Sequence, residues 1–150
     1  MSDNVAYNLL INSLDTQLLL KVHSDLSIPN PNESTPIDFV SVLEYSAIFR
    51  VLYNSSYLDR ASSEYVLNLL SQVEYKDGLR AGVPSDIKVA HKHGVRNSND
   101  QYLKQLHDCG IIYHPQNPYL LCIMTKGSDG QALTNTVQKI SQVIFQTVNN

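Results

Sequence analysis

The sequence contains no apolar run as long as a membrane-spanning helix requires, which is about 18 residues. Met1 is followed by polar residues instead of a basic segment and an apolar stretch, so we expect no export signal in this chain. The 11 Lys and Arg residues are scattered, and the net charge is −3. These features exclude a membrane span and the basic surface patch that nucleic acid requires, so we expect no nucleic-acid partner.

The composition is that of a globular protein. Hydrophobic residues make up 43% of the chain and charged residues 17%, which provides material for a core and argues against disorder. A length of 150 residues corresponds to one domain. We therefore expect a single domain over residues 1–150.

The first half of the chain has apolar residues at helical spacing. Prolines at positions 29, 31 and 36 interrupt this pattern and predict a loop. The spacing predicts helices over Asp3–Leu14, from Asp15 to about Val22, over Pro36–Asn54 and over Ala61–Val73.

After residue 78 the pattern changes to short runs of β-favouring residues separated by turn residues. These runs predict strands over Ile87–Val95, Gln105–Tyr113 and Tyr119–Thr125, and short polar connections favour an antiparallel sheet. The last helix is expected over Leu133–Val148, with one apolar face on the sheet. The prediction is an α/β fold with a helical part over 1–84 and a three-stranded antiparallel sheet with a terminal helix over 85–150.

Two short motifs carry reactive groups. Ser2-Asp3-Asn4 stands at the start of the first predicted helix, and Lys92-His93-Gly94 stands in the first predicted strand. Ser-Asp-Asn is also a favourable helix cap, and by itself this triplet has that simpler interpretation. Together the motifs resemble the Ser-Asp-Asn and Lys-Thr-Gly elements of the class A β-lactamase and penicillin-binding serine hydrolase family, with His93 where Thr or Ser is usual.

The resemblance extends over nearly the whole chain. Thr35-Pro36 before a long helix and the segments over 78–84, 108–112 and 120–125 are similar to class A counterparts in the same order. It implies hydrolysis of β-lactam or acyl-D-Ala-D-Ala amide bonds through a serine acyl-enzyme. Small peptidoglycan-type or β-lactam molecules would be the substrates, and no cofactor or metal would be needed.

The resemblance also implies a role for each motif residue. Ser2 and Lys92 would be catalytic, sharing a hydrogen bond and passing a proton to the leaving nitrogen. The remaining positions would bind substrate through its side-chain amide, its carboxylate and its oxyanion: Asn4, His93, Gly94 and Val95. Gly94 would leave room along the strand, and the N–H of Val95 would be one oxyanion donor.

Departures from the family pattern are equally informative. In the family, a Ser-x-x-Lys element supplies the nucleophile upstream of Ser-Asp-Asn, but only Met1 precedes Ser2 here. We therefore expect a domain truncated at its N-terminus that lacks the nucleophile and is inactive alone. The loop over Ser24–Thr35 is shorter than the class A Ω loop, and Glu33, its one glutamate, is better explained as a helix-capping or solvated carboxylate. For a full-length parent, the resemblance implies a periplasmic, extracellular or cell-envelope location.

Several alternatives remain open. Because His93 replaces Thr, the chain could be a degenerate binding module for peptide or cell-wall fragments. The open edges of the sheet could be completed by a homo-oligomer or by a further N-terminal segment. His91 and His93 share one strand face and could bind zinc, although substrate contact or packing explains them better. Cys109 and Cys122 could bridge across a hairpin, but we favour buried free thiols.

Overall fold

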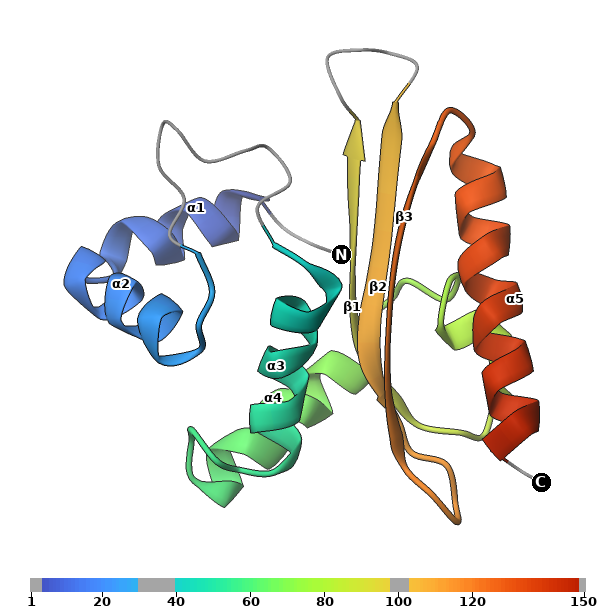
Figure 1. Ribbon diagram of the computed structural model, residues 1–150. Helices are drawn as coiled ribbons and strands as arrows, with labels where there is room; N and C mark the ends of the chain where they lie inside the picture. Colours follow the sequence, from blue (N-terminus) through green and yellow to red (C-terminus); the bar gives the residue numbers. More distant parts are fainter. Residues whose placement is uncertain (1–3, 30–39, 98–102, 149–150) are drawn as a thin grey trace.

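The computed structural model describes residues 4–29, 40–97 and 103–148. Figure 1 shows helices packed against both faces of a twisted sheet. In chain order the elements are α1 (Asn4–Ser13), α2 (Thr16–Asp25), α3 (Val42–Tyr53), α4 (Arg60–Ser71), a 3₁₀ turn (Arg80–Gly82), β1 (Val89–Asn97), β2 (Lys104–Ile112), β3 (Tyr119–Gly127) and α5 (Gly130–Val148).

The three strands form one antiparallel sheet in the order β1-β2-β3. In the register, Lys92 lies opposite Cys109, and Cys109 lies opposite Cys122. In the next row, His93 lies opposite Asp108. The predicted antiparallel sheet followed by a terminal helix is confirmed.

Each face of the sheet has its own core. On one face, α3 and α4 pack on β-strand residues through a cluster that includes Phe49, Leu67, Ala90 and Ile111. On the other face, α5 and the 3₁₀ turn pack through two clusters built around Leu79 with Val137 and around Ile112 with Phe145. Because side chains alternate along a strand, neighbouring residues of β1 belong to different environments.

Helix α3 begins later than the sequence predicts. The expected start at Pro36 falls outside the described residues, and residues 40 and 41 are not helical. The Ser41 hydroxyl accepts the Glu44 N–H (3.2 Å), while the Glu44 carboxylate accepts the Ser41 N–H (2.7 Å). This reciprocal cap satisfies two backbone donors and determines where the helix begins, so the expected start was wrong.

The first two helices differ from the rest of the molecule because they bury none of their residues. They lie beyond α3, away from the sheet (Figure 1). Seven large apolar side chains of this pair and of the connection between the two helices are exposed: Val5, Tyr7, Leu9, Leu10, Leu14, Leu18 and Leu20. Among the described residues, no helix has the length and apolarity to cross a membrane.

Candidate active site

Lys92 is held in the middle of β1 by contacts to its own backbone and to α3. Its carbonyl oxygen accepts the hydroxyl hydrogen of Tyr45 at 3.0 Å, and its ammonium group donates to the carbonyl of His93. The side chain is half-buried, and this burial lowers the pKa of Lys92, while the negative charge of Asp108 opposes part of the shift. A lysine with a lowered pKa exchanges its proton more readily near neutral pH, as a proton relay requires.

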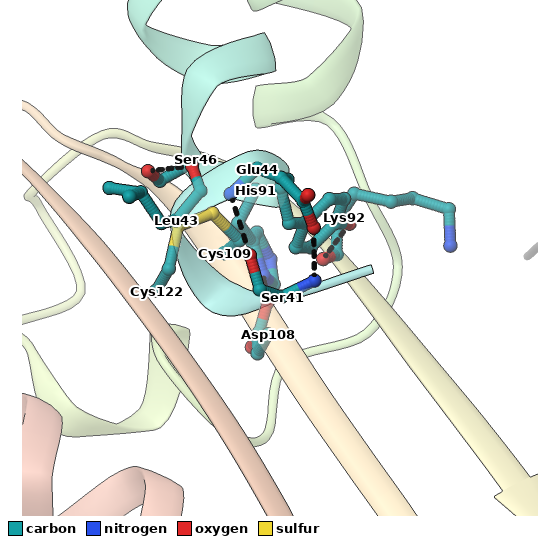
Figure 2. Close-up of a disulfide and its surroundings, with 10 residues drawn as sticks. Ser41, Leu43, Glu44, Ser46, His91, Lys92, Asp108, Cys109 and Cys122 are labelled. Atoms are coloured by element: carbon teal, nitrogen blue, oxygen red, sulfur yellow. Dashed lines mark hydrogen bonds and ion pairs between the residues drawn. A yellow bond between two sulfur atoms is a disulfide. The ribbon is translucent and has the colours of Figure 1, made fainter. Parts of the chain in front are cut away.

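A disulfide lies in the same cross-strand row as Lys92. Cys109 of β2 and Cys122 of β3 are bonded, with their Cα atoms 4.0 Å apart. Figure 2 shows the bond beside the first turn of α3, near Leu43 and Ser46. The favoured interpretation of two free thiols was therefore wrong, because the hairpin register places the cysteines directly opposite each other. The bond ties β2 to β3 under the helix that also holds Lys92.

His93 points to the opposite face of the sheet and stacks on an aromatic ring. Its imidazole lies parallel to the ring of Tyr75, with centroids 3.8 Å apart and planes 18° apart. The Nδ1 atom is buried and has no hydrogen-bond partner among the described residues. Burial, followed by the nearby charge of Lys92, lowers the pKa of His93.

A buried pair of polar side chains, His91 and Asp108, lies on the same face of the sheet as His93. Nδ1 of His91 lies 2.9 Å from the Asp108 carboxylate, and both side chains are at most 2% exposed. Because a carboxylate only accepts, Nδ1 of His91 carries the hydrogen. The other carboxylate oxygen accepts the Leu79 N–H at 3.0 Å. Strand pairing brings together residues that are 17 positions apart, a contact that sequence spacing did not reveal.

Gly78 is required where the loop before β1 passes this pair. Its φ is +61°, and a Cβ there would lie 2.6 Å from the Asp108 carboxylate and 3.2 Å from the Tyr75 ring. A side chain would be strained by the backbone angle and would displace both neighbours. Asp108 thus anchors the loop that carries Tyr75.

The space beside Gly94 is filled by a side chain that sequence reasoning missed. A Cβ on Gly94 would lie 2.3 Å from the His107 ring, so the room that the family pattern associates with this glycine is occupied on that face. The His107 ring also packs edge-on against Tyr45, with centroids 5.3 Å apart. Burial, then the charge of Lys92, lowers the pKa of His107. The next residue, Val95, has an exposed side chain.

The predicted roles of the site residues stay predictions, and some of these residues lie outside the described part of the chain. Ser2 lies outside the described residues, so its predicted hydrogen bond to Lys92 stays a prediction. Asn4 is the first residue of α1 and is exposed. Glu33 also lies outside the described residues. The described part of the predicted site therefore consists of Asn4 and of the β1 residues with the side chains around them.

One segment of the sequence does have the Ser-x-x-Lys spacing. In Ser85-Asp86-Ile87-Lys88, Ser85 is exposed in a turn, and its carbonyl accepts a hydrogen bond from Arg80. The Lys88 ammonium lies over the Tyr113 ring, 5.2 Å from its centroid. The segment is not helical, so these side chains do not share the helix face that an (i, i+3) pair needs. It also follows the Ser-Asp-Asn motif, whereas the family element precedes it.

A metal site on β1 finds no support in the side-chain arrangement. Among the described residues, no three His, Cys, Asp or Glu side chains are grouped so that they could hold a metal ion. His91 is instead paired with Asp108, and His93 is stacked on Tyr75.

Comparisons with known proteins identify the family. The sequence model of the beta-lactamase enzyme family matches residues 1–148. No curated protein matches the sequence. Similar solved structures include a β-lactamase from Sphaerobacter thermophilus, with 18% identity and a TM-score of 0.80 over 99% of this chain and 59% of that chain. PBP-A has 17% identity and a TM-score of 0.78 over 99% of this chain and 57% of that chain.

A third similar structure is the C-terminal domain of the Bacillus licheniformis BlaR penicillin-receptor, with 16% identity and a TM-score of 0.64. It is matched over 91% of this chain and 55% of that chain. This chain thus spans between about half and three-fifths of the length of these three structures. At such low identities the structures show the fold, while the family model covers nearly every residue: the chain belongs to the beta-lactamase enzyme family.

Proposed function

We propose that this chain forms the strand side of an acyl-transfer site for β-lactam or acyl-D-Ala-D-Ala amide bonds. The observation that carries the proposal is Lys92: a half-buried amine with a lowered pKa, in the Lys92-His93-Gly94 segment that resembles the family's Lys-Thr-Gly element. One similar structure is an acyl-enzyme complex of a PBP-A mutant with penicillin G, at 15% identity, with a TM-score of 0.67 over 87% of this chain and 50% of that chain. That complex supports a penicillin-like ligand.

In the proposed reaction, a serine hydroxyl gives its proton to a base as its oxygen bonds to the amide carbonyl carbon, and the carbon–nitrogen bond then breaks. Lys92, together with Ser2, passes a proton to the leaving nitrogen. The N–H of Val95 donates to the carbonyl oxygen as negative charge develops on it. Asn4 holds the substrate's amide side chain, and His93 and Gly94 hold its carboxylate end.

The nucleophile of this reaction is not among the described side chains of the site. Ser85 has the expected sequence spacing to Lys88, but it lies in an exposed turn, whereas the family element is helical. We therefore propose that the 150-residue chain alone binds substrate but forms no acyl-enzyme. With no recognisable Ω-loop glutamate to activate water, a complete site of this type would deacylate slowly, as a peptidase or penicillin-binding protein does.

A second candidate is a receptor-like module that binds ligand without turnover. Replacement of the usual Thr by His93 favours it, and the structural match to a penicillin-receptor domain is consistent with it. Both candidates predict that the ligand contacts Lys92 and His93.

The test is incubation of the chain with a fluorescent penicillin. We expect reversible binding, measured by fluorescence anisotropy, and no covalent adduct in the intact mass. Lys92→Met should weaken binding, because it removes the charge while preserving the length of the side chain. Lys139→Met, at an exposed position of α5, is the matched control and should bind as the wild type does. A covalent adduct would contradict the proposal that this chain forms no acyl-enzyme. Unchanged binding by Lys92→Met would contradict the proposal that the ligand contacts Lys92.

A further inference from the structure

The Tyr75–His93 stack limits which imidazole nitrogen a ligand can reach. The two rings are nearly parallel at a centroid separation of 3.8 Å, so Tyr75 covers one face of the imidazole. Nδ1 is buried and without a partner among the described residues, whereas the His93 side chain as a whole is only half-buried. Nε2 is therefore the ring nitrogen that remains for a ligand.

The same geometry selects a protonation state. An imidazolium carries hydrogens on both nitrogens, and its Nδ1–H would be buried with no acceptor. A neutral ring with its hydrogen on Nε2 avoids that cost, because the orphan atom is then a lone pair and not a charged donor. The Lys92 ammonium acts in the same direction, since two positive charges close together repel each other.

Tyr75 is itself held in place from two directions. Its hydroxyl interacts with Thr134 of α5, and its ring lies against Gly78, where a Cβ would come within 3.2 Å of the ring. The following residue of that loop, Leu79, is anchored by its N–H to Asp108. The ring under His93 is thus part of a supported arrangement and not a freely rotating side chain.

We propose that Tyr75 is a positioning residue that keeps His93 neutral and aims its Nε2–H at the carboxylate of the substrate. The proposal rests on the proposed function, in which His93 receives that carboxylate. It assigns a role to a residue outside both family-like motifs. It also explains how an imidazole can stand where a hydroxyl is usual: each presents one neutral hydrogen-bond donor.

Five ionisable groups surround His93 among the described residues, and all must be considered in a pH experiment. Lys92 and His91 flank it on β1, Asp108 lies opposite it on β2, and His107 of β2 lies opposite the next residue, Gly94. Tyr75 lies against its ring. Asp108 alone favours the imidazolium, while the Lys92 and histidine charges oppose it.

The first experiment measures the tautomer and titration of His93 in the purified chain by ¹⁵N NMR. At neutral pH we expect a hydrogen on Nε2 and a bare Nδ1, and on acidification we expect the imidazolium to form below the ordinary pH range of a histidine. Tyr75→Phe keeps the stack and should preserve this pattern. Tyr75→Leu removes the stack, admits water to Nδ1 and should move His93 titration into the ordinary range. The proposal is overturned if wild type and Tyr75→Leu titrate alike, or if Nδ1 carries the hydrogen in the wild type.

The second experiment compares penicillin G with its methyl ester, which lacks the negative carboxylate. Because one hydrogen bond is lost, we expect Tyr75→Leu to lower the affinity for penicillin G roughly five- to tenfold at neutral pH. The affinity for the methyl ester should change less. The Tyr75→Phe variant, which keeps the stack, should bind penicillin G as the wild type does. If neither compound binds the wild type, the proposed function fails while the tautomer result still decides the role of Tyr75. Equal loss for acid and ester would overturn the aiming of Nε2 at a carboxylate.

Discussion

The two faces of the sheet stabilise one strand by different means. On the α3 face, Lys92 lies in a row closed by the Cys109–Cys122 disulfide and covered by a helix. On the α5 face, the neighbouring residues His91 and His93 lie among an Asp, a Tyr and a tightly packed loop. A covalent bond supports the face that carries Lys92, whereas a buried polar network supports the face that carries His93. Strand alternation allows both within three consecutive residues.

The largest predicted effect is on the polar network of the α5 face. Asp108→Ala leaves His91 and the Leu79 N–H buried without their acceptor. Removing one partner of such a buried pair costs about 3 to 5 kcal/mol of unfolding free energy. Urea denaturation measures the change, and Asp86→Ala, at an exposed turn position, is the matched control. A loss no larger than the control would show that this network does not stabilise the face.

The disulfide of the α3 face should have the next largest effect. Its two cysteines are 13 positions apart, and a loop of about that length predicts a loss of about 2 to 3 kcal/mol when the bond is removed. We expect this for Cys109→Ala/Cys122→Ala in urea denaturation. Wild type under reducing conditions should show a similar loss. Equal stability of oxidised and reduced wild type would mean that helix packing alone supports this face.

Gly94→Ala tests the close packing of β1 against His107. The added Cβ would lie 2.3 Å from the imidazole ring, so the ring must move, at a cost of about 1 to 2 kcal/mol. In a double-mutant cycle, His107→Ala should remove most of the penalty of Gly94→Ala, because the clashing ring is gone. Additive effects of the two substitutions would contradict the contact.

The smallest effect is the pH dependence of stability, to which both faces contribute. His93 and His107 have lowered pKa values in the folded state, so the unfolded chain binds more protons below the ordinary His pKa of about 6.5. Their contribution to stability is present above that pH and is lost as pH falls toward their folded values. Urea midpoints should therefore fall on acidification. His107→Gln and His93→Gln should each flatten the curve, and an unchanged slope in either variant would exclude that residue.

Local pattern was sufficient for most of the fold. Apart from the start of α3, helical spacing and turn residues located the helices and strands to within a few residues, because they depend on near neighbours in the chain. The start of α3 was the main error, since the predicted proline start overlooked the reciprocal cap of Ser41 and Glu44. Lys92 and His93 were selected by the resemblance of their segment to the family's Lys-Thr-Gly element, and their roles stay predictions.

The sequence pattern could not predict contacts between residues that are far apart in the chain. Neither the Asp108–His91 pair nor the Tyr75–His93 stack has a signal in sequence spacing, because strand register and loop packing create both. The disulfide was foreseen as a geometric possibility, but only the exact register placed the two sulfurs together. The sequence by itself determined which strand carries Lys92 and His93, because strand position follows from local pattern. The tertiary structure decided which atoms of those groups are buried, paired or left for a ligand, because burial depends on what packs around them.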